Sequence, residues 1–321
     1  MEWMVSVGLF TLAGAMLYVA GELVVSGLLR LSRFFHIKEF VVAFFVMAFA
    51  GTVPNFFVGI TSAIQGIPEL SYGDVMGNNM VALTLAVALA VFFSPKKELP
   101  LESKTVQDTT FLTAIAALLP LILISDGVLS RSDGLVLIMF FIFYVIWLFS
   151  RRENFSKIYE VDKVLPPPLG RPEAIRAVAK VLVGLVMLAT SAQLVVHAAS
   201  MVATALGVSL MVIGVLVVGL GGALPELYFT FVSARKGETA MILGNLMGAV
   251  ISPATLVLGI VALIEPIYNE NLEFPIIGRL FLVAVAIFFL YLSRTKNVIS
   301  KQESYFLLAV YVLFVAVMIL V

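Results

Sequence analysis

A single glutamate, Glu226, lies within a long apolar stretch of the sequence and directly follows Pro225. The stretch covers residues 209–234, which is long enough for a helix that spans a membrane. An ionised side chain near the centre of a bilayer is costly, and it usually serves a cation or proton pathway. We therefore predict that Glu226 binds a cation. The alternative is a structural glutamate that is protonated or hydrogen-bonded.

The surroundings of Glu226 have a counterpart in the first half of the chain, where Asn55 takes the place of the glutamate. The matching segments are Ala50-Gly51-Thr52-Val53-Pro54-Asn55-Phe56 and Gly221-Gly222-Ala223-Leu224-Pro225-Glu226-Leu227. In each, proline removes a helical hydrogen bond, and unpaired backbone at membrane depth is tolerated only beside a cavity or within protein. Interruptions at corresponding positions of two halves indicate the binding site of a transporter. We predict that the second and seventh helices are broken at the bilayer midplane; a kink that serves only packing is the alternative.

Several oxygen atoms near these interruptions are suitable ligands for a hard cation. Asn55 offers an amide oxygen, and Thr52 offers a hydroxyl group one turn earlier. Broken helices also present backbone carbonyls, which coordinate hard cations well. The candidate carbonyls belong to Ala50, Gly51, Gly221 and Gly222.

A second pair of similar segments consists of Gly77-Asn78-Asn79-Met80 and Gly244-Asn245-Leu246-Met247, which are separated by a slightly shorter interval than the first pair. Asn78 and Asn245 each follow a glycine near the start of the third and eighth predicted helices. Their amides can cap or cross-link the broken helices, or they can contact the ion. We favour the cross-linking interpretation.

Glu22 is a further carboxylate inside a predicted membrane helix, and Gln193 is its counterpart at the same interval that separates Asn55 from Glu226. Its depth makes it a candidate proton site. The preferred alternative places it against a cation at a helix end or in a hydrated vestibule.

The composition predicts an all-α membrane protein. Hydrophobic residues make up 61% of the 321 residues, charged residues make up 12%, and the mean hydropathy is +1.10. The chain has no cysteine, which excludes disulfides and thiolate metal sites. Ten apolar stretches are long enough to predict spanning helices. They cover residues 4–29, 40–66, 73–93, 109–125, 133–150, 174–204, 209–234, 240–263, 274–293 and 303–321.

The charged segment 151–173 divides these helices into two sets of five and contains Pro166-Pro167-Pro168. Consecutive prolines favour an extended spacer and prevent a helix from running through. We predict a first half at 1–150, a cytoplasmic linker at 151–173 and a second half at 174–321. The repeats that carry the candidate site cover residues 40–93 and 209–263.

The distribution of lysine and arginine predicts the orientation in the membrane. These residues concentrate in the linker and in the loops that follow odd-numbered helices. To the alternate loops we assign mainly acidic residues: Glu69, Asp74, Asp126, Asp133, Glu265, Glu270 and Glu273. Both termini therefore face outside, and five helices per half make the second half enter from the opposite side. We predict two inverted five-helix repeats in a multi-pass plasma membrane protein, whose first apolar stretch is a retained helix rather than a signal peptide.

Together these features resemble the cation/calcium exchanger superfamily, whose best-known members are the sodium/calcium exchangers. The repeat motif of that family resembles Gly-Thr-Ser-Leu-Pro-Glu followed by Gly-Asn-x-x-Gly-Ser-Asn, and the likeness extends over the whole chain. The resemblance implies ten helices in inverted halves, outward termini, and α-repeats on helices 2–3 and 7–8. It also implies cation antiport by alternating access, in which helices 1 and 6 slide across the ion-holding core.

Most side-chain ligands that the resemblance implies have no match in this chain. The repeat glutamates fall on Asn55 and Glu226, so one carboxylate of two is retained. The Thr-Ser pair of the family falls on Gly51 and Thr52 in the first repeat and on Gly222 and Ala223 in the second. The later serine falls on Ala82 and Ala249, and the acidic or amide position four residues beyond it falls on Ala86 and Pro253. All of these residues are uncharged. Ca²⁺ takes about six to eight oxygen ligands and usually more than one carboxylate, so a single glutamate favours a monovalent ion or a proton.

We predict a secondary cation antiporter of the sodium/calcium exchanger type, with the ion held at the midplane by Glu226 and backbone carbonyls. The transported cation is expected to be Ca²⁺, Na⁺ or H⁺, and neither a cofactor nor an enzymatic activity is expected. The expected partners are inorganic cations and the lipid bilayer, without nucleic acid. The alternatives are a monovalent cation/proton antiporter and a non-transporting protein that retains only the exchanger scaffold.

Overall fold

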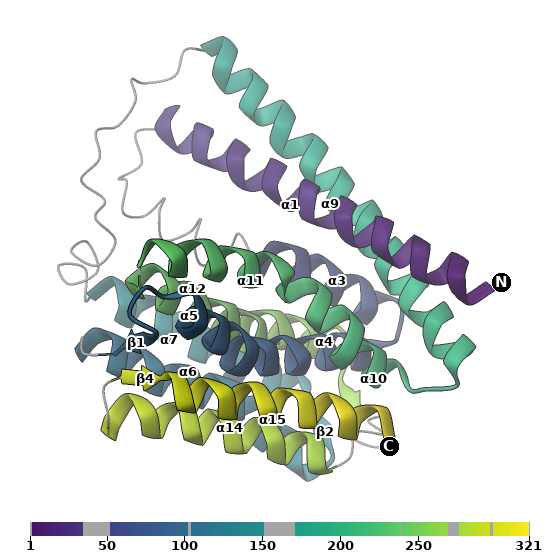
Figure 1. Ribbon diagram of the computed structural model, residues 1–321. Helices are drawn as coiled ribbons and strands as arrows, with labels where there is room; N and C mark the ends of the chain where they lie inside the picture. The colour runs from purple at the N-terminus through teal and green to yellow at the C-terminus, as the bar shows by residue number, and fades with distance from the viewer. Residues whose placement is uncertain are drawn as a thin grey trace.

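The computed structural model of the chain is almost entirely helical (Figure 1). It describes residues 2–34, 52–101, 104–150, 171–237, 239–268, 276–295 and 298–320. The α-helices are α1 (Glu2–Phe34), α3 (Thr52–Ile64), α4 (Pro68–Met80), α5 (Val87–Phe93), α6 (Lys104–Leu123), α7 (Arg131–Ser150), α9 (Arg171–Leu206), α10 (Leu210–Ile213), α11 (Gly219–Lys236), α12 (Thr239–Ser252), α13 (Leu258–Ile264), α14 (Ile276–Thr295) and α15 (Lys301–Leu320). Of the other helical segments, η1 (Val81–Ala86), η3 (Gly214–Val218) and η4 (Pro253–Val257) are π-helical, and η2 (Ile124–Asp126) is a 3-10 turn.

The lengths and apolar character of these helices are those of an integral membrane protein. Among the described residues, seven helices can cross a membrane: Pro68–Phe93, Gln107–Asp126, Arg131–Leu148, Pro172–Leu206, Leu210–Lys236, Ile242–Ile264 and Lys301–Leu320. Gly8–Val24 and Thr52–Ile64 are shorter apolar helices. The prediction of a mainly helical membrane protein is confirmed, and the count of ten spanning helices stays a prediction. Most of the predicted linker, and the first part of the predicted second helix, lie outside the described residues.

The two longest helices, α1 and α9, pack along each other on one side of the molecule (Figure 1). Glycines permit the close approach: a Cβ atom on Gly27 would lie 3.1 Å from the carbonyl oxygen of Ala177. The pair rests on the remaining helices mainly through α3. At that contact a Cβ atom on Gly21 would lie 3.2 Å from the ring of Pro54.

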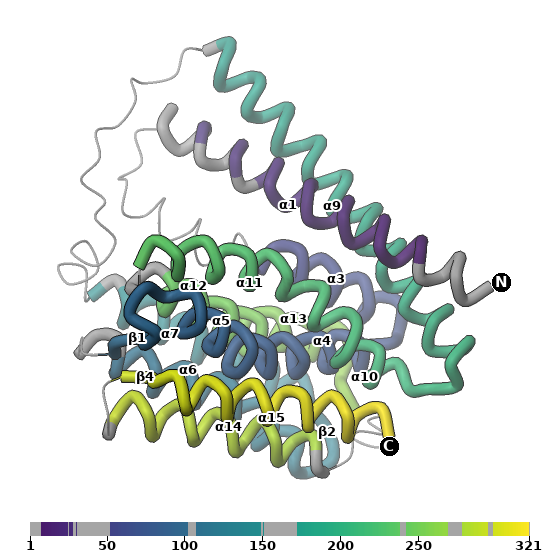
Figure 2. Tube along the Cα trace, in the orientation of Figure 1, coloured from purple at the N-terminus to yellow at the C-terminus, as the bar shows by residue number. Residues whose placement is uncertain are grey.

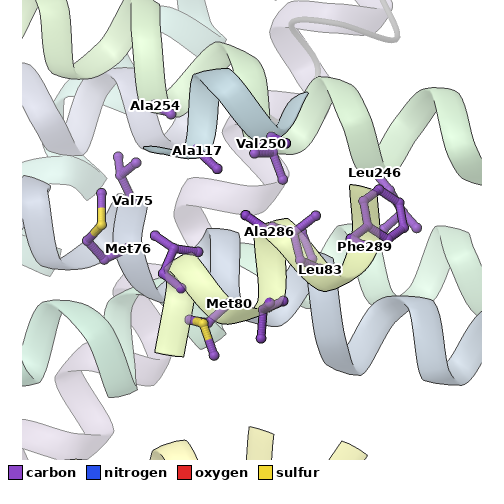
Figure 3. Close-up of a cluster of buried hydrophobic side chains, with 14 of the residues drawn as sticks. Val75, Met76, Met80, Leu83, Ala117, Leu246, Val250, Ala254, Ala286 and Phe289 are labelled. Carbon is purple, nitrogen blue, oxygen red and sulfur yellow. The ribbon is translucent and has the colours of Figure 1, made fainter. Parts of the chain in front are cut away.

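The remaining helices form a bundle whose apolar core surrounds one face of α4 and η1. Figure 2 shows α13 in the middle of this bundle, where it contacts α4. Figure 3 shows the core, where side chains from α4 and η1 meet those from α6, α12, η4 and α14. Those that Figure 3 labels are Val75, Met76, Met80, Leu83, Ala117, Leu246, Val250, Ala254, Ala286 and Phe289. Burial of this face fixes the rotation of α4 about its axis, and therefore the direction of its polar residues.

Two short antiparallel strand pairs close the bundle at its opposite ends. Strand β1 (Glu98–Pro100) pairs with β4 (Val298–Ser300), and β2 (Val128–Leu129) pairs with β3 (Ile267–Tyr268). Helix α6 connects β1 to β2 and has 20 residues, so it spans about 30 Å. In Figure 1, β1 and β4 accordingly lie at the left of the bundle and β2 at the lower right.

The predicted break in the seventh helix is not seen. Helix α11 continues through Pro225, and the irregular part is the π-helical segment η3, which ends before Gly219. A proline removes one hydrogen bond, and membrane helices accommodate that loss when local π-turns or neighbouring groups satisfy the backbone. Pro54 lies in the first turn of α3, where the missing N–H group would be unpaired in any case. The residues just before Thr52, where the other break was predicted, lie outside the described residues.

Candidate cation site

Helix α4 crosses α11 and η3 at very short range. A Cβ atom on Gly73 or Gly77 of α4 would overlap a backbone carbonyl oxygen, of Met211 and of Val215 respectively. From the other side, a Cβ atom on Gly219 would lie 2.8 Å from the carbonyl oxygen of Asp74. Glycines spaced by four residues allow membrane helices to approach this closely. The crossing therefore fixes the backbones on which the candidate site is built.

Asp74 lies at this crossing, inside α4, and its predicted place in a loop is wrong. Pro68 occupies the first turn of α4, so the helix begins before residue 73 and carries Asp74 in its second turn. The side chain is 1% exposed, and neither carboxylate oxygen has a hydrogen-bond partner among the described residues. Proline at a helix start was the sequence signal that places Asp74 in the membrane. A buried carboxylate without partners is costly unless a cation or a proton neutralises it.

Asn55 and Asp74 approach the same point beside α11. A Cβ atom on Gly222 would lie 3.0 Å from Oδ1 of Asn55 and 3.6 Å from Oδ1 of Asp74. Glycine at this position therefore leaves space for both oxygens. Asn55 is 3% exposed, and its amide nitrogen has no partner in the described part of the chain.

Glu226 lies one helical turn after Gly222 on α11, so the two residues share a face of the helix. It is 5% exposed, and its Oε2 atom has no hydrogen-bond partner among the described residues. Its carboxylate also interacts electrostatically with that of Asp74. The structure thus gathers Asn55, Asp74 and Glu226 around Gly222, and Asp74 is the member that the sequence analysis missed.

Asn78 connects the crossing to α12. Its Nδ2 atom donates a 2.8 Å hydrogen bond to the carbonyl oxygen of Ala249. The residue four positions after Ala249 is Pro253, which has no N–H group to donate to that carbonyl. Asn78 supplies a donor instead, which is the cross-linking role that we favoured. Its Oδ1 atom is buried and has no partner among the described residues.

One constant interval in residue number, the same one that separates Asn55 from Glu226, relates the matching elements of the two halves. Gly66 and Gly237, which end α3 and α11, are related by it and both have positive φ angles, of 73° and 75°. Helices α5 and α13 also begin and end at residues separated by this interval. The predicted equivalence of Asn78 and Asn245, which used the shorter interval, is therefore wrong.

In the register set by the constant interval, Gly73-Asp74-x-x-Gly77-Asn78-Asn79 pairs with Gly244-Asn245-x-x-Gly248-Ala249-Val250. Asp74, rather than Asn78, is thus the counterpart of Asn245. In the same register the serine position of the resembled motif falls on Asn78 instead of Ala82. The acidic or amide position of the family, four residues beyond that serine, falls on Ala82 instead of Ala86.

The remaining predicted residues lie at varying distances from this cluster. Thr52 begins α3 and is buried one turn before Asn55. Gly221 and Gly222 lie within regular α-helix, so they do not present unwound backbone, although Pro225 leaves the carbonyl of Gly221 without its usual donor. Asn245 lies in α12 with an unpartnered Nδ2 atom. Ala50 and Gly51 lie outside the described residues.

Glu22 lies apart from the buried cluster. It is exposed on α1 and accepts a 2.8 Å hydrogen bond from the hydroxyl group of Tyr18. This hydrogen bond within one helix gives the carboxylate a local partner, and the role of Glu22 as a proton site stays a prediction.

The described residues contain no group of three or more histidine, cysteine or acidic side chains that could hold a metal ion. The buried cluster offers two carboxylates and neutral oxygens, a donor set that suits a hard cation bound reversibly rather than a resident transition metal.

Comparison with known proteins identifies the family of the chain. The family model described as "Sodium/calcium exchanger protein" matches residues 5–150 and 176–320. The chain is similar to a putative antiporter, CaxA, of Alkalimonas amylolytica, with 27% identity over 80% of this chain and 81% of that protein. It is also similar to an uncharacterized membrane protein of Methanocaldococcus jannaschii, with 26% identity over 97% of each chain.

A solved structure of the sodium-calcium exchanger NCX_Mj has the same fold, with a TM-score of 0.62 over 98% of each chain and 24% sequence identity. The family model covers both halves of the chain, and the similar proteins are membrane proteins and antiporters. The chain belongs to the sodium/calcium exchanger family of membrane cation antiporters.

Proposed function

We propose that this antiporter exchanges cations by alternating access and holds the ion among Glu226, Asn55 and Asp74 at the crossing of α4 and α11. The observation that carries the proposal is the pair of buried carboxylates whose oxygens lack hydrogen-bond partners in the described structure: both oxygens of Asp74 and one of Glu226. Buried polar groups with a structural role are nearly always hydrogen-bonded. The absence of partners at these carboxylate oxygens therefore favours ion binding over the structural alternative.

An inverted arrangement of the two halves is part of this proposal, and the strand pairing supports it. Strand β1 follows α5 and strand β3 follows α13, so the two strands occupy equivalent places in the halves. They belong to different strand pairs, at opposite ends of α6. Parallel halves would instead place both strands at the same end of the bundle.

The capping of two helices supports the same arrangement. The backbone nitrogen of Ser130 donates to Asp133 at the start of α7, and that of Ser300 donates to Glu303 at the start of α15, each at 2.8 Å. These helices therefore begin in the same way, one after β2 and the other after β4. Lysines near β1 and β4 assign that end to the cytoplasm and both termini to the outside of the plasma membrane.

The long helices α1 and α9 are the proposed moving element. They pack tightly on each other and contact the rest of the molecule through few places, including Gly21 against Pro54 and Phe10 against Gly221. Both contacts lie next to the proposed site. A shift of the pair across these small residues exposes the site to one side of the membrane or to the other.

Ion exchange by the purified chain in proteoliposomes tests this function. With Na⁺, Ca²⁺ or H⁺ gradients imposed in turn and without ATP, at least one gradient should drive the movement of another cation. Glu226→Gln should abolish that exchange, because it removes a charge that the ion needs. Glu265→Gln, a carboxylate outside the site at the end of α13, should retain it.

The identity of the exchanged pair separates the antiporter alternatives. Exchange restricted to Na⁺ and H⁺ identifies a monovalent cation/proton antiporter, whereas Ca²⁺ movement identifies ordinary sodium/calcium exchange. A chain that moves none of the three ions retains only the scaffold, and the proposal is then wrong.

A further inference from the structure

The two halves of the chain carry an acid and an amide at crossed positions. At the first position, the first half has Asn55 and the second half has Glu226. At the second position, which lies equally far along the chain from the first in each half, the first half has Asp74 and the second half has Asn245. Each half therefore has one carboxylate and one amide in these two places, with the order reversed.

The packing places Asn55 and Asp74, the amide and the acid of the first half, near each other. Oδ1 of Asn55 and Oδ1 of Asp74 both lie within 4 Å of the point where a Cβ atom of residue 222 would be. Asp74 is thus directed toward the amide that replaces glutamate in its own half. A carboxylate at residue 74 delivers negative charge to nearly the same place as a carboxylate at residue 55 would.

Among the described residues, no group makes the hydrogen bonds to Asp74 that a purely structural role would require. Both of its oxygens are buried and unpartnered among the described residues, whereas the structural carboxylates Asp133 and Glu303 each accept hydrogen bonds at a helix start. Gly73 and Gly77 keep its helix in backbone contact with η3, so Asp74 cannot move far from α11.

We propose that Asp74 is the ion-binding carboxylate of the first half and performs there the role that Glu226 performs in the second. This inference rests on the proposed function and deepens it, because it assigns to Asp74 the negative charge that Asn55 does not supply in the first half. The site then holds two negative charges, so the argument from a single carboxylate in favour of a monovalent ion no longer applies. Two carboxylates balance one divalent cation, or two monovalent charges bound together.

Isosteric substitutions that move the charge without changing the shape test the proposal. Asp74→Asn removes the charge, Asn55→Asp adds one, and the double variant Asn55→Asp/Asp74→Asn moves it from α4 to α3. Glu69→Gln, on the same helix but in its first turn, is the matched control. Two readouts apply to each protein: exchange in proteoliposomes, and the shift in melting temperature that NaCl or CaCl₂ causes in detergent.

We expect Asp74→Asn to weaken cation affinity at least about tenfold, because the charge of the ligands sets the affinity of such sites. The double variant should recover affinity to within about threefold of the wild type, and Glu69→Gln should resemble the wild type. In the absence of cations, Asp74→Asn should melt at a higher temperature than the wild type, because it lacks a buried unpaired charge.

The outcomes separate the inference from the function on which it rests. If the Asp74→Asn variant exchanges cations as the wild type does, the inference is overturned and the proposed function remains intact. A double variant as impaired as Asp74→Asn also overturns it, because position 74 would then matter for a reason other than charge. A wild-type chain that neither exchanges cations nor is stabilised by them overturns both.

Discussion

The side-chain amide of Asn78 is hydrogen-bonded to the backbone carbonyl of Ala249, its own counterpart in the second half of the chain. Two equivalent residues of a repeat can touch only where the symmetry axis that relates the repeats passes between them. This contact therefore marks the axis of the proposed inverted repeat at the meeting of α4 and α12. The candidate carboxylates lie one turn away along α4, on Asp74, and across the crossing on α11.

Substitution of Asn78 by alanine should destabilise this contact. The carbonyl of Ala249 would lose a donor that Pro253 cannot replace, and hydrogen bonds between membrane helices contribute about 1 kcal/mol. We expect a fall of a few degrees in the melting temperature of the purified protein. Asn79→Ala is the matched comparison, since neither polar atom of the Asn79 side chain has a partner in the described structure, and it should melt no lower than the wild type. Equal melting temperatures for wild type and Asn78→Ala would show that the hydrogen bond does not support the fold.

The crossing of α4 and η3 should tolerate no side chain at Gly77. A Cβ atom there would overlap the carbonyl oxygen of Val215, which is backbone and cannot rotate away. Gly77→Ala should therefore cost about 1–3 kcal/mol or prevent folding, as measured by thermal unfolding and by the yield of monodisperse protein. Gly14→Ala on α1 meets nothing within 4 Å and should be neutral or slightly stabilising. A Gly77→Ala protein as stable as Gly14→Ala would contradict the close crossing.

The proposed inverted topology predicts which loops share a side of the membrane. Because the chain has no cysteine, single cysteines can be introduced without background. Cysteines at Lys96 and Lys301 should react with an impermeant thiol reagent from one side, and cysteines at Asp126 and Tyr268 should react from the other. All four positions are exposed. Labelling of residues 96 and 268 from the same side would show that the halves are parallel.

Much of the fold could be predicted from the sequence because its main determinant is local. A membrane helix is specified by an uninterrupted apolar stretch, and the predicted bounds of α7, α9 and α14 lie within a few residues of those observed. The interruption near Pro225 was harder to predict. Whether a proline breaks a helix depends on neighbouring groups that satisfy the backbone, and here the helix remains continuous through Pro225, while the irregular segment η3 lies before it.

The candidate site was predicted only in part, for a related reason. Glu226 and Asn55 could be found because a repeat and a proline mark them. Asp74 was assigned to a loop because the third helix was expected to begin at residue 73, although Pro68 indicates an earlier start. The approach of Asp74 to Asn55 depends on the glycine crossing of α4 and α11, a contact between distant parts of the chain that no local pattern encodes.

The proposed site can be tested by locating the bound cation. Crystals of the purified chain with Sr²⁺, and separately with Tl⁺, would reveal the ion through its anomalous scattering. We predict a peak between Asp74 and Glu226, within coordination distance of Oδ1 of Asn55 and of at least one carboxylate oxygen of each acid. A fully occupied peak elsewhere in the membrane region, or a site in which Asp74 and Glu226 bond only to protein groups, would contradict it.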